Sequence, residues 1–138
     1  MHRPHPIRSA ARSTRMIQTA IRLATLVPLL AGGAGAAFGP AFLGEAAGPA
    51  TASHLRYLSG LLLGVGLLGW WCAGRLAERR AVFAALCALV VLGGIARLAG
   101  MVIDGLPPWP HRLALGMELG VVPALWWATW RGPRDGDA

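Results

Sequence analysis

The chain contains four apolar runs, each about as long as the hydrocarbon core of a membrane is thick. They cover roughly residues 17–39, 53–73, 81–103 and 112–130. A helix needs about 20 consecutive apolar residues to cross that core. Hydrophobic residues make up 55% of the chain and charged residues only 14%. The sequence therefore predicts an all-α protein, a four-transmembrane-helix antiparallel bundle in the lipid bilayer.

Short polar segments beside these runs define the predicted organisation. Residues 1–16 form an arginine-rich N-terminal tail, residues 17–131 the membrane domain and residues 132–138 a C-terminal tail. The first run ends in small residues that resemble a signal-peptide cleavage site. Because the apolar stretch continues to Leu43, we favour an uncleaved span. Met16 is a second candidate for the start of the protein.

The basic residues predict an orientation in the membrane. The net charge is +7, and all 13 basic residues are arginines. Such a balance is typical of nucleic-acid binding, but most of these arginines flank the apolar runs, so we exclude that function. Cytoplasmic loops carry an excess of Lys and Arg. Nine of the arginines lie in the two tails and in the central loop, namely Arg3, Arg8, Arg12, Arg15, Arg75, Arg79, Arg80, Arg131 and Arg134.

We therefore expect both termini to be cytoplasmic, and the links around Glu45 and Pro107 to face outward. The absence of lysine beside abundant Ala, Gly and Leu indicates GC-rich coding. We expect a bacterial protein of the inner (plasma) membrane.

Two ionisable side chains lie inside the last two apolar runs. Arg97 precedes Asp104 by seven positions, and Glu118 follows His111 by seven. The proline-rich link between the runs cannot continue a helix. At about 1.5 Å rise per residue, both side chains lie roughly 10 Å from the same end of a helical hairpin. Burying a lone arginine costs about 2.5 to 3.5 kcal/mol on insertion scales, so we predict that Arg97 pairs with Glu118.

The second run begins with polar side chains that the predicted topology places at the same outer end. The predicted polar cluster comprises Arg56, Tyr57, Ser59, Arg97, Asp104 and Glu118. Two arginines against Glu118 leave one positive charge, which Asp104, Glu45 or an external anion could balance. Three roles stay open: a structural pair that fixes helix register, a site for a small anion or lipid headgroup, and an interface with another membrane protein.

Other recognisable patterns in the sequence do not indicate a disulfide, a metal site, a cofactor site or a catalytic site. Cys72 and Cys87 are too few for a disulfide framework or a metal site, and His54 and His111 are typical of interfacial histidines. The letters of Gly64–Gly69 match a dinucleotide-binding fingerprint, which requires a preceding strand. Here the glycines lie inside an apolar run, where they instead predict close helix packing, and Gly60 with Gly64 also forms a small-xxx-small pair. We predict no catalytic residues, no metal and no cofactor.

Several motifs, in order, resemble a bacterial family of small membrane proteins described as domain of unknown function 4345. They are Phe38-Gly39-Pro40, Arg56-Tyr57-Leu58-Ser59-Gly60, Gly93-Gly94-Ile95-Ala96-Arg97-Leu98, Gly105-Leu106-Pro107 and Glu118-Leu119-Gly120-Val121-Val122-Pro123. The resemblance covers about residues 17–131. It implies an uncleaved first span and no assigned activity.

These patterns lead to one expectation for function and two alternatives. We expect an integral membrane protein of unassigned activity whose Arg/Glu cluster is structural or binds a small anion or lipid headgroup. Because four short spans are similar to DoxX-like proteins, the first alternative is an accessory subunit that binds a quinone-like ligand. The second is a small proton-coupled transporter. It ranks last because the first run has no glutamate.

Overall fold

The computed structural model describes residues 6–44 and 46–131, with side chains from residue 12 onward. The described chain is helical apart from its links, and it contains no strand in these two ranges. Four of its helical stretches are long and apolar enough to cross a membrane. The predicted all-α fold with four spans is therefore confirmed.

The first half of the chain contains two long helices. Helix α1 covers Pro6–Phe38, the short helix η1 covers Gly39–Leu43, and α2 covers Pro49–Gly74. Helix α1 begins well before the predicted first span, so the described part of the predicted N-terminal tail is helical. Pro28 lies inside α1 without ending it. Gly39, with φ +61°, ends α1 in the left-handed conformation that favours glycine.

The second half contains α3 and an interrupted fourth span. Helix α3 covers Arg80–Asp104 and ends at Gly105, with φ +96°. The fourth span consists of α4 (Trp109–Gly116), a π-helical turn η2 (Met117–Val121) and α5 (Val122–Arg131). The wide turn has a local cause at Pro123, which has no N–H and whose ring would clash with the carbonyl of Leu119. The N–H of Val122 bonds instead to the oxygen of Met117, five residues back.

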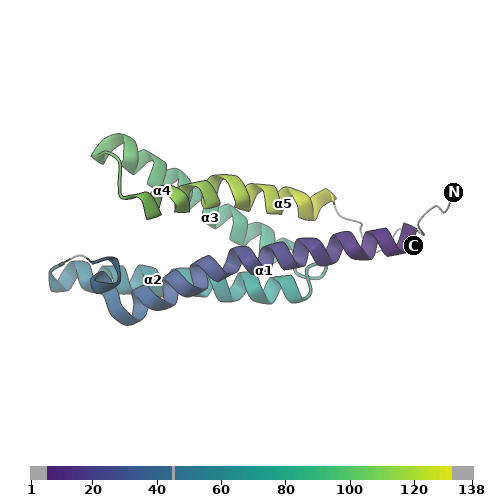
Figure 1. Cartoon of the computed structure of the whole chain (residues 1–138), viewed down its shortest axis with the longest axis horizontal. Helices are drawn as coiled ribbons and strands as arrows, with labels where there is room; N and C mark the ends of the chain where they lie inside the picture. Colours follow the sequence, from purple (N-terminus) through teal and green to yellow (C-terminus); the bar gives the residue numbers. More distant parts are fainter. Residues whose placement is uncertain (1–5, 45, 132–138) are drawn as a thin grey trace. The chain divides into compact units, whose positions relative to one another are not determined.

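The described residues divide into two compact units, residues 21–74 and residues 6–20 with 75–131. In the first unit, α1 and α2 lie side by side and are joined through η1 (Figure 1). In the second, α3 packs against α4, η2 and α5, which return along it after the proline-rich turn (Figure 1). Each unit thus contains an antiparallel helical hairpin.

Glycines bring α1 and α2 into close contact. A Cβ on Gly32 would overlap the backbone N of Leu63 and lie 2.9 Å from the oxygen of Ser59. A Cβ on Gly35 would overlap Ser59 Oγ, and one on Gly66 would lie 2.8 Å from the backbone N of Leu29. Small residues at such positions allow two helix backbones to approach.

Of the glycines predicted to pack helices together, Gly66 does so, whereas Gly60 and Gly64 do not. A Cβ on Gly60 or on Gly64 would meet no atom of the described chain within 4 Å. These two positions lie on a face of α2 that α1 does not cover, and their spacing alone could not reveal which face that is. The predicted close packing is therefore confirmed at Gly66 and not at Gly60 or Gly64.

We expect the Gly32→Ala substitution to destabilise the α1–α2 hairpin. Its Cβ would meet backbone atoms of Leu63, which cannot rotate away, and overpacking costs typically about 1 to 3 kcal/mol. Gly33→Ala is the matched control, because a Cβ there meets nothing within 4 Å. Thermal unfolding in detergent should show a lower midpoint for Gly32→Ala and an unchanged or higher one for Gly33→Ala. Equal midpoints would contradict the packing described.

Candidate functional site

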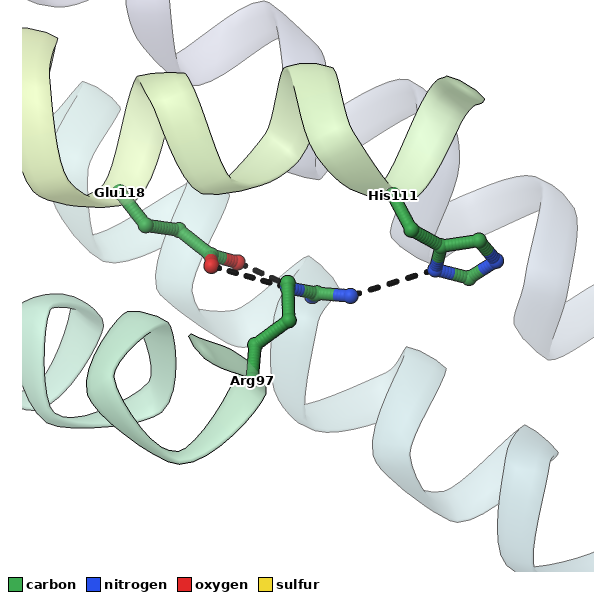
Figure 2. A network of polar contacts seen from close by, with 3 residues as sticks. All are labelled: Arg97, His111 and Glu118. Carbon is green, nitrogen blue, oxygen red and sulfur yellow. Dashed lines mark hydrogen bonds and ion pairs between the residues drawn. The ribbon is translucent and has the colours of Figure 1, made fainter. Parts of the chain in front are cut away.

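The candidate site lies where α3 passes α4 and η2, and it is built around Arg97. Nε of Arg97 donates to Glu118 Oε2 at 3.0 Å, and Nη2 donates to Glu118 Oε1 at 3.0 Å. Figure 2 shows the carboxylate facing one edge of the planar guanidinium. A two-point pair of this kind fixes orientation as well as charge. The structure therefore contains the predicted Arg97–Glu118 pair.

His111 is the third member of this cluster. Its Nδ1 lies 3.2 Å from Nη1 of Arg97, on the other side of the guanidinium from Glu118 (Figure 2). Arginine has only donors, so Nδ1 accepts this hydrogen bond and the proton of the neutral ring resides on Nε2. The Arg97–Glu118–His111 cluster then has no net charge, since one guanidinium balances one carboxylate.

Close backbone packing positions the pair. Gly94 is buried one turn before Arg97 on α3. A Cβ on Gly94 would lie 2.9 Å from Glu118 Cβ and 2.8 Å from Leu119 Cδ2. The missing side chain lets η2 approach α3, which places Glu118 within reach of the arginine one turn further on. The turn itself belongs to the helix type that is frequently found at functional sites.

The cluster is only partly buried. The side chain of Arg97 is 33% exposed and that of Glu118 is 18% exposed. Two further glycines lie on the Arg97 side of α3, four positions before it and three after it. A Cβ on Gly93 would meet nothing within 4 Å, and one on Gly100 would meet only Asp104 Oδ2, at 3.8 Å. At these two positions α3 therefore places no side chain beside Arg97.

Arg56 lies in the other unit and has different partners. Its Nη1 donates to the oxygens of Ala36 and Ala37, at 2.8 and 2.6 Å. Both oxygens belong to the last turn of α1, where carbonyls have no partner within the helix and the dipole is negative. Arg56 thus caps the C-terminus of α1. A Cβ on Gly39 would lie 3.1 Å from its guanidinium carbon, so the Phe38-Gly39-Pro40 and Arg56–Gly60 segments meet at the end of α1.

The remaining predicted site residues have separate environments. Ser59 is buried, with 8% exposure, against Gly35. Tyr57 is 63% exposed. Asp104 is exposed at the end of α3, and no salt bridge joins it to another residue in the ranges that the structure describes. The prediction that Arg56, Tyr57 and Ser59 share a site with Arg97 and Glu118 concerns two separate units and stays a prediction. Glu45 lies outside the described residues.

The sequence analysis did not predict the contact of His111 with Arg97 or the contacts between arginines and tryptophans. The seven-residue spacing of His111 and Glu118 places both on one helix face, but His111 was not included in the predicted cluster. Arg22 was not considered, and its guanidinium carbon lies 5.8 Å from the ring centre of Trp70. Arg131 lies similarly 3.6 Å from the ring centre of Trp127. Both arginines thus lie at cation–π distance from a tryptophan ring.

The fold and the cluster together define a multi-pass membrane protein with a paired arginine inside a span. Residues 16–129 match the model of a family described as a domain of unknown function (DUF4345), so the chain belongs to that family. No curated protein and no solved structure matches the chain. Among the described residues, no group of three His, Cys, Asp or Glu side chains could hold a metal ion.

Removing either member of the Arg97–Glu118 pair should destabilise the protein, because the other charge is left within the span. Breaking a fully buried pair costs about 3 to 5 kcal/mol, and we expect less here because both side chains are partly exposed. In a double-mutant cycle, Arg97→Ala with Glu118→Ala should recover part of the loss in unfolding midpoint measured for each single change. Strictly additive losses would show that the pair contributes no coupling.

Proposed function

We propose that this protein is a four-span protein of the bacterial inner membrane in which Arg97 binds an oxyanion near the outer face. The ligand class is a phosphate or similar group, either on a lipid headgroup or on a small free anion. The proposal concerns binding and not catalysis, because the cluster offers hydrogen-bond donors and charge but no nucleophile among the described residues.

The observation that carries the proposal is the unequal use of the guanidinium. A guanidinium has five N–H groups arranged along two edges that can each hold an oxyanion at two points. Glu118 occupies the edge formed by Nε and Nη2. The second edge, formed by Nη1 and Nη2, holds only His111 among the described residues. The Arg97 side chain is 33% exposed, and a purely structural pair would not require that exposure.

The surroundings support access to that edge. Gly93 and Gly100 put no side chain beside Arg97 on α3. At about 10 Å from the helix end, a long arginine can extend toward the polar headgroups, as basic side chains near span ends do. An oxygen-bearing headgroup or solute could therefore reach the second edge without passing through the apolar core.

A second candidate follows from the neutrality of the cluster. With Arg97 balanced by Glu118, the two groups carry no net charge, and the Nε2–H of His111 is a neutral donor. Donors of this kind also suit the carbonyl oxygen of an uncharged, quinone-like ligand. We rank this candidate second because the open edge of Arg97 matches a two-point oxyanion better than a single carbonyl oxygen.

The orientation forms part of the proposal. The loop that contains Arg75, Arg79 and Arg80, and the two termini, would face the cytoplasm. The tryptophans that stack with Arg22 and Arg131 would then lie at the inner interface, and the proline-rich turn after α3 at the outer one. The Arg97 cluster would accordingly be reached from outside the cell.

The ligand prediction can be tested on purified, delipidated protein in a neutral detergent at one mildly acidic pH. Thermal unfolding should be measured with sulfate, with short-chain phosphatidylglycerol and with a water-soluble quinone. We expect at least one oxyanion to raise the unfolding midpoint. Arg97→Lys, which keeps the charge but loses the two-point fork, should weaken that effect at least about tenfold in concentration. Arg112→Lys is the control, since Arg112 is exposed on α4.

The compounds that raise the unfolding midpoint distinguish the two candidate ligands from a purely structural pair. Stabilisation by sulfate and by phosphatidylglycerol supports a simple oxyanion site, and stabilisation by the lipid alone assigns the headgroup. Stabilisation by the quinone alone favours the second candidate over the first. If no compound shifts the midpoint, or if Arg97→Lys responds like the unchanged protein, the binding function is wrong and the pair is structural.

Orientation is tested by labelling single cysteines in a variant that lacks Cys72 and Cys87. Leu106→Cys lies in the exposed turn after α3 and Ala77→Cys in the exposed loop before it. In intact spheroplasts, a membrane-impermeant maleimide should label position 106 and should label position 77 only after permeabilisation. The reverse pattern would place the Arg97 cluster at the cytoplasmic side.

A further inference from the structure

We infer that His111 links ligand binding to proton uptake, so that the site takes up one proton together with one oxyanion. This inference rests on the proposed function and names how the same site would be regulated. It depends on one contact, the hydrogen bond between Nη1 of Arg97 and Nδ1 of His111 (Figure 2).

The direction of that hydrogen bond follows from the chemistry of the two side chains. Arg97 can only donate, so His111 must present an unprotonated Nδ1 to it. When His111 gains a proton, Nδ1 becomes a donor as well. The N–H of Nδ1 then faces the N–H of Nη1, so neither atom can accept a hydrogen bond from the other. The imidazolium of His111 also lies beside the guanidinium of Arg97, and these two positive charges repel each other. Protonation therefore breaks the contact and releases Nη1.

The release of Nη1 completes the second edge of the guanidinium. Glu118 still occupies Nε and Nη2 from one side, while the edge formed by Nη1 and Nη2 loses its only partner among the described residues. The net charge of the cluster changes at the same time from zero to +1, because the imidazolium is added to a balanced pair. Nη1 and Nη2 can then both donate to one oxyanion, whose negative charge would neutralise the +1 charge of the cluster.

Other charged groups nearby do not replace His111 in this role. The elements packed against α4 are α3 and η2. On α3 the charged groups toward this end are Arg97 and Asp104, and Asp104 is exposed without a salt bridge in the described part of the chain. On η2 the charged group is Glu118, which is engaged by Arg97. On α4 itself, Arg112 stays positive throughout. Among all these, only His111 accepts a hydrogen bond from Arg97 at a ring nitrogen that can gain a proton.

Oxyanion binding and protonation of His111 should favour each other. If the protonated form binds the anion more tightly, the bound anion must in turn favour protonation of His111. Affinity for the oxyanion should then rise as the pH falls from about 8 to 5. Sulfate is the appropriate probe, because it stays doubly charged over this range, whereas phosphate changes its own charge.

The experiment is a sulfate titration followed by thermal unfolding at a series of pH values in delipidated detergent-solubilised protein. We expect the apparent affinity to be at least about fivefold higher at the acidic end, the lower limit of usual coupling between two sites. His111→Gln should abolish this pH dependence, because the glutamine amide oxygen can accept from Arg97 but does not titrate. His54→Gln, at an exposed histidine of α2, is the control and should keep it.

The outcomes separate this inference from the proposed function. If sulfate binds equally at all pH values, or if His111→Gln keeps the pH dependence, the proton linkage is wrong while the oxyanion site stands. If sulfate fails to bind at every pH and phosphatidylglycerol also fails, the proposed function itself is wrong. A variant that does not fold would be replaced by His111→Asn, whose shorter amide offers the same non-titrating acceptor.

Discussion

A positive charge inside a span has to be balanced within the protein, and this requirement organises the hairpin of α3 and the fourth span. Burying an unpaired arginine at the centre of a span costs at least about 2.5 to 3.5 kcal/mol. Arg97 meets this requirement with a carboxylate from the neighbouring span. Arg56 is exposed near the start of α2 and bonds to the carbonyl oxygens that end α1. One arginine is thus paired with a charge and the other with a helix dipole.

Each balanced arginine depends on a glycine that brings two backbones together. Gly94 allows η2 to approach α3 one turn before Arg97, and Gly39 leaves room for the guanidinium of Arg56 at the end of α1. In the α1–α2 hairpin, Gly35 also accommodates the buried hydroxyl of Ser59. In a bilayer, where apolar surfaces gain little by associating with each other, such close packing and polar contact replace the hydrophobic driving force.

The sequence predicted much of this arrangement, and its failures have identifiable reasons. Apolar length alone gave the four spans, and helix rise gave the common depth of Arg97 and Glu118. The partner of Arg56 was missed because only side chains were considered as acceptors, whereas the carbonyls of Ala36 and Ala37 are set free only by the end of a helix. Gly60 and Gly64 were chosen by spacing, which does not show which helix face is covered. The π-helical turn before Pro123 was not predicted, because its form depends on backbone geometry.

Structural and ligand-binding roles for the Arg97 cluster are compatible, because they use different edges of one guanidinium. The edge held by Glu118 joins α3 to the fourth span, and removing it would leave a charge unbalanced. The contact with His111 contributes less to that connection, since it is a single hydrogen bond to a neutral acceptor, whereas Glu118 forms a two-point pair of opposite charges. A contact of that strength can be exchanged for a ligand oxygen while the helices stay joined. The same residue can therefore hold the hairpin together and present a binding surface, provided that Glu118 and His111 stay on opposite sides of it.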